Sequence, residues 1–224
     1  AVPEGAGNGD GPGRPTETPR PSPPPEQPTP PSNVRPDGAK VDPGGPVEVD
    51  KHEIAMVFVV DRSGSMGEVL PGGQTKMSFV KTAARRTADA LTAGDQVGII
   101  TFGTEGLGRT VLQLTDVVDR ATVNKGIDGL AHAREQTYLL AGLRLAREQL
   151  AASTLAVRHV VVLTDGEFFD DPVPLRALAH EMREQGMTLS IVSIVDGTTG
   201  AAFQTNAEFV ARDGGGQFLP ITDA

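Results

Sequence analysis

The chain has 224 residues, no cysteine and a formal net charge of −9. The absence of cysteine excludes disulfides and thiolate metal sites, and the absence of a Lys- or Arg-rich run argues against nucleic acid or an anionic membrane surface as a partner. No apolar run approaches the roughly 18 residues of a membrane-spanning helix, so we expect no direct membrane insertion of this chain.

All but four of the 18 prolines lie before residue 51, in a stretch with almost no bulky apolar side chains. Such a segment cannot bury enough surface to offset its ordering entropy, so residues 1–50 are predicted to be a disordered Pro/Gly-rich linker or stalk. Residues 51–224 are long enough for one domain with a core. A proline-rich stalk is typical of a tether, which predicts an extracytoplasmic or cell-surface location, tethered to a membrane. The chain has neither an initiator Met nor a signal sequence, which predicts processing or excision from a longer protein.

Four apolar runs without polar alternation predict strands buried on both faces, the habit of a parallel sheet flanked by helices. In chain order these runs are 54–60, 97–102, 159–163 and 189–195. Helical periodicity is present at 76–91, 137–150 and 172–186, while 110–114 suits an antiparallel edge strand and 214–221 a last short strand. The predicted fold class is α/β: a doubly wound, mostly parallel central sheet with one antiparallel edge strand and helices on both faces.

Two of the predicted strands end in acidic residues. Doubly wound sheets bind their ligands beyond the carboxyl ends of the strands, which is where these acids lie. Asp61 closes the first strand within "DRSGS", and Asp165 follows the third major strand within "LTDGE". If those strands are neighbours, the two carboxylates converge. Ser63 and Ser65 follow Asp61 at alternate positions, and Thr137 stands at the start of a predicted helix.

This set contains only oxygen donors, which favour a hard divalent cation. We predict that Asp61, Ser63, Ser65, Thr137 and Asp165 bind Mg²⁺, with Mn²⁺ or Ca²⁺ as alternatives. Mg²⁺ retains waters and accepts an outside ligand more readily than a complete protein cage. Each residue also has a plainer interpretation: Asp61 as a strand terminator, Asp165 as a turn acid, and Thr137 as a helix cap through its hydroxyl.

The three segments resemble the metal-ion-dependent adhesion site of the von Willebrand factor type A domain. That family carries Asp-x-Ser-x-Ser, then a Thr, then an Asp in a Thr-Asp-Gly turn, and the matching residues here are Asp61, Ser63, Ser65, Thr137 and Asp165. The resemblance covers about residues 52–224 and implies a Rossmann-like fold. Two features depart from it: "GLAHAREQT" replaces a glycine-rich approach to the Thr, and no counterpart of the family's mobile C-terminal helix precedes Ala224.

The resemblance implies a metal-dependent protein-binding module for adhesion or interaction, whose open coordination position takes an acidic side chain of a protein partner. The alternative is a segment of a bacterial membrane-anchored envelope or assembly protein that acts with an AAA-type ATPase or other subunits. Phe168 and Phe169, directly after the metal turn, are predicted to form an apolar rim for the partner, unless at least one packs beneath the following loop.

Catalysis is not expected. A phosphatase of the haloacid dehalogenase type needs a second Asp at the position that Ser63 holds, and neither a GxSxG elbow nor a GxxxxGK[ST] loop is present. The four histidines at 52, 132, 159 and 180 are scattered along the sequence and suggest no site.

Overall fold

A six-stranded sheet forms the centre of the part of the chain that the computed structural model describes, residues 53–166, 168–195 and 200–222. The predicted linker at 1–50 lies outside the described residues. The strand order is β3-β2-β1-β4-β5-β6, and every neighbouring pair is parallel except β2 with β3. The strands are β1 (Ile54–Asp61), β2 (Gln96–Phe102), β3 (Gly108–Asp116), β4 (Val157–Thr164), β5 (Met187–Ile194) and β6 (Gly215–Ile221). The predicted sheet, including its antiparallel edge strand, is confirmed.

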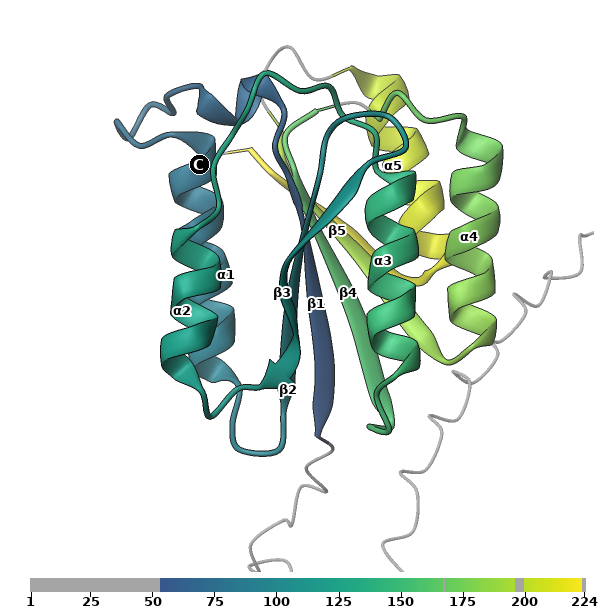
Figure 1. Cartoon of the computed structure of the whole chain (residues 1–224). Coiled ribbons are helices and arrows are strands. Elements are labelled where there is room, and N and C mark those ends of the chain that lie inside the picture. The colour runs from purple at the N-terminus through teal and green to yellow at the C-terminus, as the bar shows by residue number, and fades with distance from the viewer. Residues whose placement is uncertain (1–52, 167, 196–199, 223–224) are drawn as a thin grey trace, which may run out of the picture. The chain divides into compact units, whose positions relative to one another are not determined.

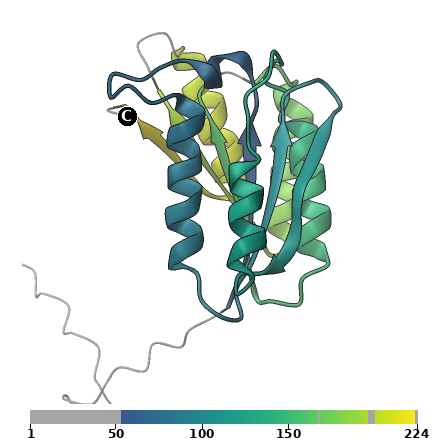
Figure 2. The ribbon, with the colours of Figure 1, turned by 60° about the vertical axis from the view of Figure 1, so that its left-hand side comes forward.

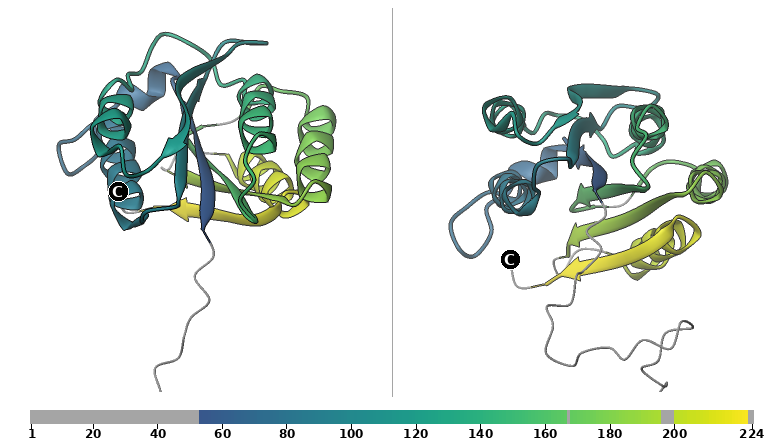
Figure 3. Two further views of the ribbon diagram at one scale, coloured as in Figure 1. Left: turned by 60° about the horizontal axis from the view of Figure 1, so that its bottom comes forward. Right: turned by 90° about the horizontal axis from the view of Figure 1, so that it is seen from below.

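Helices cover both faces of this sheet (Figure 1). They are α1 (Lys76–Ala90), α2 (Arg120–Asp128), α3 (Leu140–Ala151), α4 (Pro172–Glu184) and α5 (Ala201–Asp213). Helices α1 and α2 lie on one face and α3, α4 and α5 on the other, as the view from below makes plain (Figure 3). Three of these helices were predicted individually, whereas α2 and α5 were not.

Strand β1 shows why its sequence carries no polar alternation. Val57 and Val59 face the apolar cluster beneath α3, α4 and α5, while Met56, Phe58 and Val60 face the cluster beneath α1 and α2. Both sets are buried, so each position of the strand loses apolar surface to one of the two helix layers.

Helix α3 lies close to the strands because of a glycine. A Cβ at Gly142 would stand 3.1 Å from Cβ of Phe102 and 3.1 Å from Cγ1 of Val59, which is tighter than most such contacts. The absence of that Cβ lets the helix approach β1 and β2, and so fixes the loop that enters α3 against the end of the sheet.

The winding of the sheet reverses between β1 and β4. The chain runs from β1 outward to β2 and β3 on one side, then returns to β4 and continues outward through β5 and β6 on the other. Ligands of such sheets bind beyond the carboxyl ends of the strands at this reversal. Figures 1 and 2 show that the loop after β1 and the segment joining α2 to α3 lie at this same end.

Among the described residues, no helix combines the length and the apolar character that crossing a membrane requires.

Candidate metal centre

Asp61 occupies the last position of β1 and has no exposed surface. Its Oδ1 accepts a hydrogen bond of 2.7 Å from the backbone N–H of Ser63, and its Oδ2 accepts one of 2.6 Å from the hydroxyl of Thr164 at the end of β4. These two bonds fix the carboxylate rigidly and tie the ends of the two central strands together.

A chain of hydroxyl contacts continues from this carboxylate to Asp165. The hydroxyl oxygens of Ser63 and Ser65 are 3.0 Å apart, and Ser65 donates to Oδ1 of Asp165 at 2.9 Å. The structure therefore brings together four of the five predicted site residues, which come from two loops about 100 positions apart in sequence. The expected convergence of the two acids is confirmed, while their role as metal ligands stays a prediction.

Thr137, the fifth predicted residue, lies between α2 and α3 (the second loop, residues 129–139). It is buried beside the segment that joins β4 to α4 (the third loop, residues 165–171). Its carbonyl oxygen accepts a hydrogen bond of 3.0 Å from the backbone N–H of Phe169. Within the described part of the chain, its hydroxyl makes no hydrogen bond to the other four residues. The structure thus places Thr137 against the loop that carries Asp165, without a direct side-chain link.

The alternative that Thr137 caps a helix is wrong. Helix α3 begins at Leu140 and its N-cap is Leu139, which makes no side-chain cap. The backbone N–H groups of Leu139 and Leu140 instead donate to the carboxylate of Asp170. Asp170, in the third loop, therefore accepts hydrogen bonds from backbone N–H groups at the start of α3 that lack a partner within the helix. This role was not predicted from the sequence.

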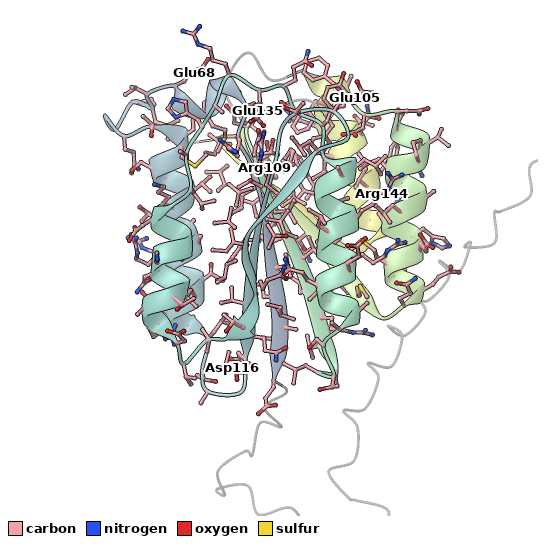
Figure 4. The ribbon with its side chains drawn as sticks, in the orientation of Figure 1. Glu68, Glu105, Arg109, Asp116, Glu135 and Arg144 are labelled. Carbon is pink, nitrogen blue, oxygen red and sulfur yellow. The ribbon has the colours of Figure 1, made fainter. Side chains whose placement is uncertain are left out.

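Glu135 joins the second loop to the segment between β1 and α1 (the first loop, residues 62–75). Its carbonyl accepts from the backbone N–H of Gly64 at 3.3 Å, and its carboxylate pairs with Arg109 of β3 at 2.7 Å and with Arg62 at 3.9 Å. Burial raises the pKa of Glu135, but the two guanidinium groups outweigh it and hold that pKa below its usual value. Figure 4 shows Glu135 and Arg109 close together at the site end of the sheet.

The electrostatics of the site differ sharply between its two acids. Burial raises the pKa of Asp61 to about 6, against the hydrogen bonds from Thr164 and Ser63, and the nearby charge of Asp165 raises it further. Among the described residues, no Lys, Arg or His side chain forms an ion pair with Asp61, so this buried carboxylate has no compensating positive charge there.

Asp165 has such a charge beside it. Its Oδ2 lies 2.8 Å from Nζ of Lys76, the first residue of α1, and Nζ also donates to Oε2 of Glu68 at 2.8 Å. The contact with Asp165 is an ion pair without hydrogen-bond geometry, because Oδ2 is buried and has no hydrogen-bond partner among the described residues. Sequence reasoning missed Lys76, although a lysine at the first position of a helix is an unfavourable placement that could have drawn attention.

These donors fit a hard divalent cation. The described residues hold no group of three or more His, Cys, Asp or Glu side chains suited to a metal. The convergent set is instead two carboxylates with hydroxyls, all oxygen, and it contains a buried carboxylate oxygen with remaining acceptor capacity at Asp165. A cation here would also relieve the cost of keeping Asp61 ionised.

Of the two aromatic residues predicted to form an apolar rim, Phe169 is exposed beside the site and Phe168 is packed in the core. Phe168 packs edge-on against Phe102 and Phe203, with ring centroids 6.4 and 5.3 Å apart, and so belongs to the core beneath α4 and α5. Phe169 is 58% exposed and stacks beside Tyr138, with centroids 5.9 Å apart. An apolar surface next to the site therefore comes from Phe169 and Tyr138.

Comparison with known proteins identifies the family of this domain. The profile of the von Willebrand factor type A domain matches residues 55–215, and the chain belongs to this family. The sheet order, the mixed edge and the helices on both faces agree with that assignment. No curated protein matches the sequence.

Solved structures with the same fold come from several settings. BatB, a conserved hypothetical protein from Bacteroides thetaiotaomicron, is 20% identical with a TM-score of 0.62, and the match covers 76% of this chain and 91% of that one. The vWF domain of the type V pili tip protein Mfa5 from Porphyromonas gingivalis is 14% identical with a TM-score of 0.61, covering 77% and 90%. Proximal thread matrix protein 1 from the mussel byssus, with a zinc-occupied MIDAS motif, is 19% identical with a TM-score of 0.61, covering 75% and 41%. At these identities the likeness concerns the fold alone.

Proposed function

We propose that this domain is a metal-dependent protein-binding module. Asp61, Ser63, Ser65, Thr137 and Asp165 hold a divalent cation, Mg²⁺ in the first instance, and a carboxylate of a protein partner completes its coordination. One observation carries the proposal: hydrogen-bonded contacts link Asp61, Ser63, Ser65 and Asp165 at the carboxyl ends of β1 and β4.

The bound cation supplies a positive charge that attracts and orients an anionic group. The residues of the chain supply the rest. Thr164 and the backbone N–H of Ser63 keep the Asp61 carboxylate in one orientation, and Ser65 does the same for Asp165. Because both carboxylates are already fixed, little side-chain entropy is lost when a cation binds.

The surface beside the site suits a protein partner. Phe169 and Tyr138 present an aromatic pair on the same loops that carry Asp165 and Thr137. A partner segment whose acidic residue is followed by an apolar side chain would satisfy the cation and this pair together, since aromatic side chains commonly anchor interfaces.

Proteins with this fold include a pilus tip protein and a byssus matrix protein, and these settings support an interaction role outside the cytoplasm. We extend that role to this chain as a surface-exposed module tethered to a membrane. An aerotolerance-related membrane protein from Bacteroides fragilis has the same fold at 18% identity and a TM-score of 0.61. It supports a second candidate, a segment of a bacterial membrane-anchored envelope or assembly protein acting with an AAA-type ATPase or other subunits. Both candidates use the same metal site, and neither assigns a catalytic step to it.

The test is calorimetric titration of Mn²⁺ and Mg²⁺ into the wild-type protein, Asp61→Ala and Asp165→Ala. Asp116→Ala is the matched control, because Asp116 is an exposed acid at the opposite end of the sheet (Figure 4). The proposal predicts one site in the wild type and the control, and loss of binding in both site variants. Equal binding by all four proteins would refute it.

A further inference from the structure

Lys76 is a buried cation in an unfavourable position. The residue is 4% exposed and stands at the first position of α1, where the helix dipole already presents positive charge. Taking an ammonium group out of water is strongly unfavourable unless opposite charges compensate it. Such a placement persists only when a strong local interaction favours it.

That interaction is with the candidate metal centre. Nζ of Lys76 lies 2.8 Å from Oδ2 of Asp165, whose side chain has no exposed surface, and 2.8 Å from Oε2 of Glu68, whose side chain is 61% exposed. The backbone N–H of Lys76 also donates to the carbonyl of Glu68 at 2.9 Å, so Lys76 and Glu68 are joined through their backbones as well as their side chains. Figure 4 shows Glu68 at the site end of the sheet.

The two acids of the site are therefore treated differently by the fold. Asp165 is neutralised by Lys76, while burial acts on Asp61 with no paired cation. Counted over the described buried side chains Asp61, Asp165 and Lys76, the metal-free site carries a net charge of −1 rather than −2. This difference limits the repulsion between the two carboxylates when no cation is bound.

Binding of a divalent cation changes the sign of the net charge of the site. Among the described side chains of the buried site, two carboxylates at −1 each, a cation at +2 and Lys76 at +1 leave a surplus of +1, and solvent screens the exposed Glu68. We propose that Lys76 is the built-in counter-ion of this site: it weakens cation binding, and it gives the loaded site a surplus positive charge that a partner's carboxylate neutralises. The inference rests on the proposed function and adds a reason for its preference for anions.

The experiment compares Mn²⁺ and Mg²⁺ affinities of wild type, Lys76→Met and Glu68→Gln by calorimetry. Methionine preserves the apolar stem and removes the charge, so the cation should bind at least about tenfold more tightly. Glu68→Gln removes a negative charge near the ammonium and should weaken binding about twofold to threefold. Lys81→Met is the matched control on the same helix, because Lys81 bonds to the carbonyl of Asp128 away from the site, and its affinity should equal that of the wild type.

Thermal unfolding in EDTA provides a readout without metal. Lys76→Met should melt below the wild type in EDTA, because Asp165 then lies buried without a counter-charge, and added Mg²⁺ should raise its melting temperature more than it raises that of the wild type. A purely structural lysine would lower the melting temperature without strengthening the response to Mg²⁺.

A carboxylate probe tests the second half of the inference. Acetate binding to the Mn²⁺-loaded proteins can be followed by water proton relaxation, since acetate displaces a metal-bound water. Acetate should bind severalfold more weakly to Lys76→Met than to the wild type. Equal or tighter acetate binding would contradict the surplus-charge role.

The outcomes separate the two proposals. If the wild type binds the cation and a folded Lys76→Met binds it equally or more weakly, the counter-ion role is wrong and the proposed function stands. If Lys76→Met does not fold, Glu68→Gln decides, and unchanged or tighter binding there overturns the inference. If the wild type binds neither Mn²⁺ nor Mg²⁺, the proposed function fails and the inference fails with it.

Discussion

Replacing Asp61 by Asn should stabilise the metal-free protein while abolishing its response to Mg²⁺. Asp61 has no exposed surface, and burial raises its pKa from an ordinary 3.8 to about 6. The amide of Asn keeps an oxygen that can accept from the N–H of Ser63, and the Thr164 hydroxyl can turn to accept from the amide nitrogen. The substitution therefore removes the buried charge and preserves the shape.

The expected magnitude follows from the pKa. A rise of about two units, at 1.36 kcal/mol for each unit, corresponds to a cost on the order of 3 kcal/mol at neutral pH. The folded state holds the proton of Asp61 more tightly than the unfolded state does. The contribution of this group to stability is thus fully present below about pH 4 and is lost as the pH rises through about 6.

The assay is urea denaturation in EDTA between pH 4 and pH 8 for the wild type and Asp61→Asn. The free energy of unfolding of the variant should exceed that of the wild type by about 1–3 kcal/mol above pH 6, and the two should approach one another near pH 4. Addition of Mg²⁺ should stabilise the wild type alone. An Asn variant that is less stable at pH 7, or that keeps the wild-type pH dependence, would refute the assignment of Asp61 as an uncompensated buried charge.

Four further substitutions test other parts of the structure. Phe168→Ala should lower the free energy of unfolding in urea by about 3 kcal/mol, because its ring packs in the core. Phe169→Ala should change that free energy by less than about 0.5 kcal/mol and weaken partner binding at unchanged Mn²⁺ affinity. Equal stability losses in the two variants would contradict this division. Asp170→Ala should cost about 1–2 kcal/mol and weaken Mn²⁺ binding in calorimetry, since the start of α3 loses its acceptor, and unchanged stability would count against that role. Gln149→Met should raise the unfolding free energy by about 1 kcal/mol, because neither amide atom of this buried side chain has a partner among the described residues, and a loss of stability would show that the amide is satisfied.

The sheet and the convergence of its two acids could be predicted because they follow from local pattern and topology. Uninterrupted apolar runs ending in Asp61 and Asp165 identify parallel strands with acids at one edge, and the pairing of β1 with β4 then places those acids together. Ser63 and Ser65 lie within the same short loop as Asp61, so their position depends on few residues.

Helices α2 and α5 were not predicted individually, although a signal was present. Val123, Gly126 and Ile127 of α2, and Phe203 and Ala207 of α5, are buried at helical spacing. Helix α2 is only nine residues long, and small residues such as Gly126 and Ala207 occupy part of the buried face of the two helices, so their apolar pattern is easily overlooked in the sequence.

Lys76 and Asp170 could not be predicted as parts of the site, because their roles depend on contacts between distant loops. In sequence, Lys76 is one charged residue at the start of an amphipathic helix, and Asp170 is the first of two adjacent acids that precede Pro172. Only the folded chain brings Lys76 to Asp165 and the carboxylate of Asp170 to the start of α3. Such long-range pairing leaves no periodic pattern.

The central claim is that two carboxylates and neighbouring hydroxyls enclose a single divalent cation at the carboxyl ends of β1 and β4. Anomalous diffraction from crystals soaked in Mn²⁺ tests it directly. The account predicts one strong peak within coordination distance of Ser63 and Ser65, beside Asp61, Asp165 and Thr137, with a coordination position open to solvent or held by a carboxylate from a neighbouring molecule. A peak elsewhere in the domain, or no peak at saturating Mn²⁺, would contradict it.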